Sequence, residues 1–215
     1  MVNGEQRSAS DRQPQVIECK LVLLGDANAG KTSLVVRLVK NRFNAAQPAT
    51  VGAAFTQHRV PVAEANELIQ FGIWDTAGSE RYRSLAPMYY RGAQAAVIVY
   101  DMTSKESFEG AQMWLSELRE QGMPNCVVAL AANKADLEEA RQVTTQEGQM
   151  YARQNEMAYF ETSAQSAQNV SRVFVELANR MPRSLASGRC ADPAAGSLLL
   201  GSADGSGRRE SRCCT

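Results

Sequence analysis

Hydrophobic residues follow two spacings that alternate along most of the chain. Residues 16–24 alternate and then run apolar, which is typical of a strand buried in a parallel sheet. Apolar residues then recur at helical spacing, at positions 34, 35, 38 and 39. The repetition predicts an α/β fold, with a mostly parallel six-stranded sheet, one antiparallel edge strand and about five flanking helices. The expected strands are 16–24, 53–62, 68–74, 94–101, 126–132 and 158–162, and the expected helices are 31–41, 105–121, 145–155, 168–181 and a short one after Arg83.

The second expected strand contains a proline, Pro61. Proline has no N–H to donate to a neighbouring strand, so it is confined to the edges of sheets. We therefore expect residues 53–62 to be the edge strand of a hairpin that closes through residues 64–67.

Composition limits the class of protein. The 23 basic and 23 acidic residues cancel, and no basic stripe occurs in the first 180 residues, so we expect no nucleic-acid partner. No apolar run approaches the roughly 20 residues that a membrane span requires. Residues 1–13 are polar and expected to be disordered, and residues 14–182 are expected to form one domain.

The composition changes after residue 182 to Gly, Ser, Ala and Arg, which cannot build a core, so residues 183–215 are expected to be a flexible tail. Leu198–Leu200 interrupt this tail; they are either incidental or a docking segment for a partner, and both interpretations stay open.

Cysteine and histidine add little chemistry. Cys19 and Cys126 lie in expected strands, where a small buried thiol is the ordinary interpretation. The single histidine, His58, is expected to face solvent from the edge strand and leaves no histidine-based metal site or catalytic triad to build.

Residues 25–33 read Gly-Asp-Ala-Asn-Ala-Gly-Lys-Thr-Ser and join the first expected strand to the first expected helix. A glycine-rich loop in this place presents its backbone N–H groups to an anion at the positive end of a helix. Lys31 is expected to reach the outer phosphates of a nucleotide, and the Thr32 hydroxyl to hold Mg²⁺. This loop predicts binding of a nucleoside triphosphate.

Two further motifs follow strands at the edge of the sheet where ligands collect. In residues 73–78, Ile-Trp-Asp-Thr-Ala-Gly, Asp75 is expected to contact Mg²⁺ through water and the Gly78 N–H to face the γ-phosphate. In residues 133–136, Asn-Lys-Ala-Asp, the Asp136 carboxylate can accept hydrogen bonds from the N1–H and 2-amino group of guanine, which adenine cannot offer. The order of the motifs predicts a guanine nucleotide.

With these motifs in order, the sequence resembles a Ras-like small GTPase, a P-loop NTPase with a G domain, over about residues 16–182. Residues 74–78 and 89–93 (Tyr-Tyr-Arg-Gly-Ala) and the double cysteine near the end resemble the Rab branch. Residues 50–55, 85–96 and 133–137 are similar to the early-endosome Rabs in particular.

The resemblance implies further roles. Thr50 would ligate Mg²⁺ and bind the γ-phosphate, Phe43 would pack beside the base, and residues 161–164 would offer backbone N–H groups to the guanine oxygen. The implied Mg²⁺ residues are Thr32, Thr50 and Asp75, and the implied catalytic residues are Lys31, Thr50, Gly78 and Ser79. The residues expected to contact GTP or GDP are Asp26, Ala27, Asn28, Ala29, Gly30, Lys31, Thr32, Ser33, Phe43, Thr50, Gly78, Asn133, Lys134, Asp136, Ser163, Ala164 and Gln165.

The resemblance also implies a switch. The segments around Thr50 and Gly78 would order on the γ-phosphate and relax after hydrolysis. Phe55, Trp74 and Tyr89 match the aromatic trio that Rabs present to effector proteins, although ordinary core packing is the alternative interpretation. Implied partners are effectors, an exchange factor, an activating protein, and Rab escort and GDP-dissociation-inhibitor proteins.

Three positions depart from the family. Ser79 stands where most small GTPases have a glutamine that orients the attacking water, and serine is too short to reach the same water. A loss of about 1 to 3 kcal/mol of transition-state stabilisation would slow intrinsic hydrolysis by roughly 5- to 150-fold. The resemblance implies an activating protein that supplies an arginine and a glutamine in trans, so assisted hydrolysis would survive. Ala27 replaces a glycine and could crowd an incoming arginine, and Gln165 replaces a lysine whose stem packs on the sugar.

The chain ends in Cys213-Cys214-Thr215, which is not a CaaX box. It resembles the double-cysteine endings on which Rabs carry two geranylgeranyl groups. Two lipid chains hold a protein stably on a membrane and one holds it marginally. Two idle terminal cysteines are the alternative.

The leading hypothesis is a monomeric Rab-type switch that binds and slowly hydrolyses GTP and recruits effectors for vesicle trafficking. It would act on the cytosolic face of endomembranes, the early endosome in particular, with a soluble cytosolic pool. A constitutively GTP-bound recruiter that does not hydrolyse, because of Ser79, is the main alternative. A P-loop metabolite kinase is disfavoured by residues 133–136.

Overall fold

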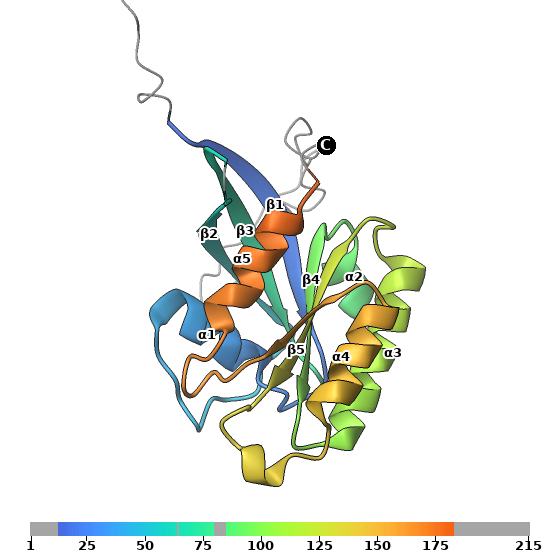
Figure 1. The fold of residues 1–215 in the computed structure, drawn as a ribbon. Coiled ribbons are helices and arrows are strands. Elements are labelled where there is room, and N and C mark those ends of the chain that lie inside the picture. Colours follow the sequence, from blue (N-terminus) through green and yellow to red (C-terminus); the bar gives the residue numbers. More distant parts are fainter. Residues whose placement is uncertain (1–12, 64, 80–84, 183–215) are drawn as a thin grey trace, which may run out of the picture.

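The computed structural model describes residues 13–63, 65–79 and 85–182. It contains a six-stranded sheet in the order β2-β3-β1-β4-β5-β6 (Figure 1). The strands are β1 (Gln15–Leu24), β2 (Ala53–Pro61), β3 (Glu67–Thr76), β4 (Ala95–Asp101), β5 (Val127–Asn133) and β6 (Ala158–Glu161). The helices are α1 (Lys31–Lys40), α2 (Ala86–Tyr90), α3 (Lys105–Gln121), α4 (Thr145–Gln154), α5 (Val170–Arg180) and a short 3₁₀ turn, η3 (Glu138–Ala140).

Only the pairing of β2 with β3 is antiparallel, and all other strand pairs are parallel. Pro61 is the last residue of β2 and lies at the sheet edge, as its missing N–H requires. The predicted α/β fold, with its single antiparallel edge strand and five α-helices over the described ranges, is confirmed.

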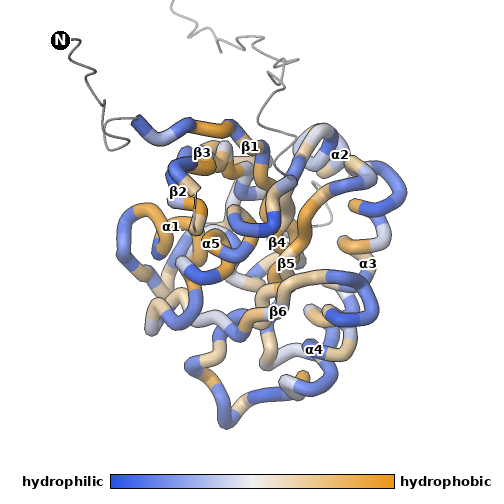
Figure 2. Tube along the Cα trace, turned by 45° about the horizontal axis from the view of Figure 1, so that its top comes forward, coloured by the Kyte–Doolittle hydropathy of each residue, from blue (hydrophilic) through white to orange (hydrophobic). Residues whose placement is uncertain are grey.

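Helices cover both faces of the sheet. In β1, Leu21 and Leu23 pack into one hydrophobic cluster with α1 and α5, whereas Val22 and Leu24 pack into a second cluster with α2, α3 and α4. Successive side chains of a strand point to opposite faces, so a strand buried on both sides reads as a continuous apolar run. Figure 2 shows the same arrangement, with hydrophobic residues gathered in the central strands and hydrophilic ones in the outer loops.

Three local expectations require correction. Cys126 lies just before β5, because its N–H bonds to the carbonyl of Met123 in a turn. The last helix begins at Val170 because Asn169 has a left-handed backbone, with φ of 54°. His58 is half-buried rather than facing solvent, because it lies opposite Phe71, a core residue, on the inner face of β2.

Cys19 is buried, as expected, and burial raises the pKa of the half-buried Cys126 thiol to about 12.

Among the described residues, no three or more His, Cys, Asp or Glu side chains group as a metal site, and no helix is both long and apolar enough to cross a membrane.

Candidate nucleotide-binding site

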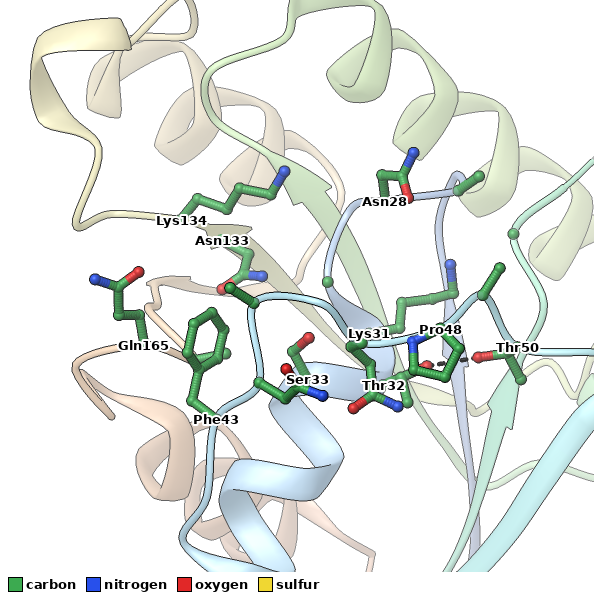
Figure 3. Close-up of a pocket in the computed structure, with 18 of the residues that line it drawn as sticks. Asn28, Lys31, Thr32, Ser33, Phe43, Pro48, Thr50, Asn133, Lys134 and Gln165 are labelled. Atoms are coloured by element: carbon green, nitrogen blue, oxygen red, sulfur yellow. Dashed lines mark hydrogen bonds between the residues drawn. The ribbon is translucent and has the colours of Figure 1, made fainter.

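A pocket of about 690 Å³ opens at the carboxyl ends of the parallel strands, where the loops after β1, β3 and β5 meet (Figure 3). Ligands of open α/β sheets bind at this edge. The predicted residues that line it are Ala27, Asn28, Gly30, Lys31, Thr32, Ser33, Phe43, Thr50, Gly78, Ser79, Asn133, Lys134, Asp136, Ala164 and Gln165. The sequence motifs therefore converge on one cavity of a size suited to a small ligand.

The loop between β1 and α1 depends on its two glycines. Gly25 has φ of 142°, and a Cβ there would overlap the carbonyl oxygen of Val99. Gly30 has φ of 93°, and a Cβ there would overlap the amide of Asn133, which donates to the Ala29 carbonyl at 2.9 Å. Glycine is thus required for both the backbone conformation and the close packing. The first turn of α1 presents its free N–H groups to the cavity, as an anion site does.

Lys31, the first residue of α1, is 5% exposed. Its ammonium donates to the carbonyls of Gly25 at 2.7 Å and Asp26 at 2.8 Å. Burial lowers the pKa of Lys31 to about 8, although the charges of Asp75 and Asp26 oppose the shift. A buried cation of this kind gains stability from an anionic ligand such as a phosphate.

The three residues predicted to hold Mg²⁺ lie together beyond Lys31. The hydroxyl oxygens of Thr32 and Thr50 are 2.6 Å apart (Figure 3). Asp75 is buried and hydrogen-bonds with Thr32, and among the described residues its Oδ1 has no hydrogen-bond partner. Burial raises the pKa of Asp75, while a hydrogen bond from Thr32 and the charge of Lys31 lower it. Mg²⁺ prefers oxygen ligands and is usually bound by one or two carboxylates together with phosphates. The two threonine hydroxyls and the buried carboxylate of Asp75, with one oxygen unpaired, fit this preference.

The segment after β3 closes this end of the cavity. A Cβ on Gly78 would overlap the backbone of Asp26 and Ala27 and the ammonium of Lys31, so only glycine lets this backbone approach so closely. Ser79 is half-buried and lines the cavity. Thr76 also lines it, which the sequence did not indicate, and its hydroxyl donates to the Leu23 carbonyl at 2.6 Å.

The opposite end of the cavity is held by a network of hydrogen bonds. The Ser163 hydroxyl donates to Asp136 Oδ1 at 2.5 Å, and the Thr162 hydroxyl donates to Asn133 Oδ1 at 3.3 Å. Lys134 forms an ion pair with Asp101. Phe43, Lys134 and Gln165 lie together at this end in Figure 3, away from Thr32 and Thr50.

Arg37, in the last turn of α1, also supports this end and was missed in the sequence. Its Nε donates to the Ala164 carbonyl at 2.7 Å and its Nη2 to the Gln165 carbonyl at 2.9 Å. An arginine near the end of an amphipathic helix reads as a solvated charge, so no pattern in one sequence could have identified it.

Four predicted residues do not line the cavity. The Ala29 side chain is fully buried, and Asp75 is buried in contact with Thr32. Ser163 is buried and acts on Asp136 rather than on the cavity. The Asp26 carboxylate points away to α3, where it accepts a hydrogen bond from the Trp114 indole at 3.0 Å.

The predicted aromatic trio forms one cluster on the surface of β2, β3 and α2. The ring centroids of Phe55 and Trp74 are 5.2 Å apart, and those of Trp74 and Tyr89 are 5.7 Å apart. Phe55 is 54% exposed, which argues against an ordinary core role.

Cys213 and Cys214, the predicted lipidation sites, lie outside the described residues.

Comparison with known proteins agrees with this geometry. A profile of the Ras family matches residues 20–183. The chain is 52% identical over 199 residues to Ras-related protein RHN1 of Nicotiana plumbaginifolia, covering 93% of this chain and 96% of the relative. It is 50% identical over 206 residues to Ras-related protein Rab5 of Nicotiana tabacum, covering 96% and 100%. It is 46% identical over 201 residues to Ras-related protein Rab-5A of Dictyostelium discoideum, covering 93% and 97%.

Proposed function

This chain belongs to the Ras family and is a small GTPase of the Rab5 type. We propose that it is a slow timed switch that recruits effector proteins to a membrane only while GTP is bound. The family binds GTP, GDP and Mg²⁺, and Rab5-type proteins act in endosomal trafficking. The observation that carries the proposal is that the phosphate loop and Asp136 lie at the two ends of one cavity.

The phosphates bind at the loop end. Backbone N–H groups of residues 27–33 hold them, and the Lys31 ammonium neutralises their outer oxygens. Thr32, Thr50 and Asp75 would hold Mg²⁺, which would offset the charge of the phosphates.

Guanine binds at the opposite end. Asp136 accepts from the N1–H and 2-amino group, and the Ser163 hydroxyl fixes the rotamer that it needs. Arg37 holds this loop through the carbonyls of Ala164 and Gln165. The N–H groups of Thr162 and Ser163, which were expected to face the base, already donate to other backbone carbonyls, so of residues 162–164 it is the Ala164 N–H that is left for the guanine oxygen. Phe43 packs on the base.

Switching depends on two contacts with the γ-phosphate. Thr50, whose hydroxyl lies 2.6 Å from that of Thr32, would bind Mg²⁺ and the γ-phosphate, and the Gly78 N–H would donate to the γ-phosphate. Loss of the γ-phosphate releases both segments. The neighbouring cluster of Phe55, Trp74 and Tyr89 is the surface that effectors read.

Ser79 sets the rate of the switch. It lines the cavity but is too short to orient the attacking water as a glutamine does, so intrinsic hydrolysis is slow and an activating protein completes it. The alternative function, favoured by the same residue, is a recruiter that stays GTP-bound and does not hydrolyse.

Membrane attachment rests on Cys213 and Cys214, each carrying a geranylgeranyl group. In the cytosol, Rab escort and GDP-dissociation-inhibitor proteins cover these lipids. An exchange factor loads GTP at the cytosolic face of the early endosome, where the monomeric protein recruits its effectors.

A single-turnover assay on the full chain tests this function. The protein is loaded with GTP, and phosphate release is followed with and without a Rab-type activating domain. Slow release alone and fast release with the domain are expected. No release in either case, with bound GTP verified, would replace the timed switch with the non-hydrolysing recruiter, and failure to bind GTP would remove both.

A further inference from the structure

Gly110 is an unexpected residue in the interior of α3. It is buried and its backbone is helical, without the positive φ found at four other glycines of the described chain. Glycine is disfavoured relative to alanine in the middle of a helix. Because no backbone conformation requires it, the reason for this glycine has to lie in the space beside it.

That space is occupied by the carboxylate of Asp26. A Cβ on Gly110 would overlap both carboxylate oxygens and the Cγ of Asp26. One helical turn further along α3, the indole N–H of the buried Trp114 donates to Asp26 Oδ1 at 3.0 Å. Residues four apart lie on the same face of a helix, so Gly110 makes room for the carboxylate and Trp114 binds it.

The backbone of Asp26 belongs to the phosphate-binding loop. Its carbonyl accepts from the Lys31 ammonium at 2.8 Å and from the Ala29 N–H at 3.4 Å. Gly78, at the start of the second switch segment, packs directly on the backbone of Asp26 and Ala27. A single residue thus joins the phosphate loop to α3 through its side chain and to the switch through its main chain.

We propose that Asp26, Gly110 and Trp114 form an anchor, the Asp26 anchor, that fixes the phosphate loop in its binding shape and slows nucleotide release. The three are positioning residues, since the side chain of Asp26 points away from the cavity and acts through the loop. This inference rests on the proposed guanine-nucleotide site and deepens it. Pre-organisation of this kind reduces the ordering that binding requires, so it adds affinity without a new contact to the ligand.

Release of a fluorescent GDP analogue from the Mg²⁺-loaded full chain, chased with excess GDP, tests the anchor. Asp26→Ala removes the acceptor. Trp114→Phe removes the indole donor together with part of a buried ring, and Gly110→Ala displaces the carboxylate while favouring the helix. Each is expected to release the analogue about 10-fold faster than wild type. Glu109→Ala, an exposed neighbour on the same helix, is the matched control and releases at the wild-type rate.

The double variant Asp26→Ala/Gly110→Ala distinguishes an anchor from general damage to α3. Once the carboxylate is absent, the alanine at 110 displaces nothing, so release is no faster than from Asp26→Ala alone. Asp26→Asn keeps an oxygen acceptor for Trp114 and releases several-fold more slowly than Asp26→Ala. Thermal unfolding in excess GDP verifies that each variant is folded.

Wild-type release from Gly110→Ala and Trp114→Phe would overturn the anchor, as would a double variant whose release equals the product of the single effects. Both results leave the nucleotide switch standing. Failure of the wild-type chain to bind guanine nucleotide would instead overturn the proposed function and the anchor together.

Discussion

The two ends of the nucleotide cavity are built differently. At the base end, Asp136 is held by Ser163, and the loop after β6 is held by Arg37. At the phosphate end, Thr50 makes one hydrogen bond within the described part of the chain, to Thr32, and its neighbour Val51 is 77% exposed. A pre-organised base end gives constant recognition of guanine. At the phosphate end, the phosphate loop is also fixed, through Asp26, but the loosely held segment around Thr50 can order and relax with the γ-phosphate.

The largest effect is expected from breaking the rigid end. Asp136→Asn replaces one of the two acceptor oxygens by an NH₂ group, which leaves one guanine donor unpaired and facing another donor, so GTP affinity should fall by about 10³-fold or more. The asparagine amide can instead donate to the 2-oxygen of xanthine. Titration with guanine and xanthine nucleotides measures both affinities, and unchanged GTP binding would contradict the assignment of the base end.

At the opposite end, Ser79→Gln sharpens the comparison because it changes chemistry and not recognition. The longer amide can orient the attacking water, so intrinsic hydrolysis should rise by roughly 5- to 150-fold. Single-turnover phosphate release measures the rate. Ser79→Ala is the matched control and should hydrolyse no faster than wild type; equal rates for the glutamine and serine forms would show that Ser79 does not limit hydrolysis.

Lys31 gives the phosphate end a dependence on pH. Burial depresses the pKa of Lys31 to about 8 in the free site, so above this pH the lysine is neutral and must gain a proton before it can pair with phosphate. GDP affinity should therefore fall as pH rises, by about 10-fold between pH 7 and pH 9. Titrations across this range measure it. Lys31→Met should bind GDP more weakly at every pH, and its GDP affinity should no longer change with pH. A wild-type GDP affinity that rises with pH would contradict this prediction.

Sequence patterns predicted those features of the fold and the site that depend on residues close together in the chain. The apolar run of β1 follows from burial on both faces, and Pro61 identified the edge strand before any pairing was known. The phosphate loop is contiguous, so its residues could be identified together.

Contacts between distant segments could not be predicted in the same way. Arg37 meets Ala164, and Asp26 meets Trp114, across long separations in sequence. Periodicity identifies which face of a helix is apolar but not which loop its polar end will reach. The half-buried position of His58 depended likewise on Phe71 in the neighbouring strand.

The smallest expected effect comes from a substitution of Arg37. This residue tests the contrast between the two ends directly, because it contacts the base end from α1, the helix that begins at the phosphate end. Arg37→Lys keeps the charge but cannot span both carbonyls with a planar fork, so GDP should be released about 3- to 10-fold faster. Hydrolysis of bound GTP should be unchanged, since Thr50, Gly78 and Ser79 are not touched. Fluorescent GDP release and single-turnover hydrolysis measure the two ends separately, with Lys40→Arg, an exposed change in the same turn, as the control. Equal changes in both rates would mean that the ends are mechanically coupled through α1 and that the division between a rigid base end and a mobile segment around Thr50 does not hold.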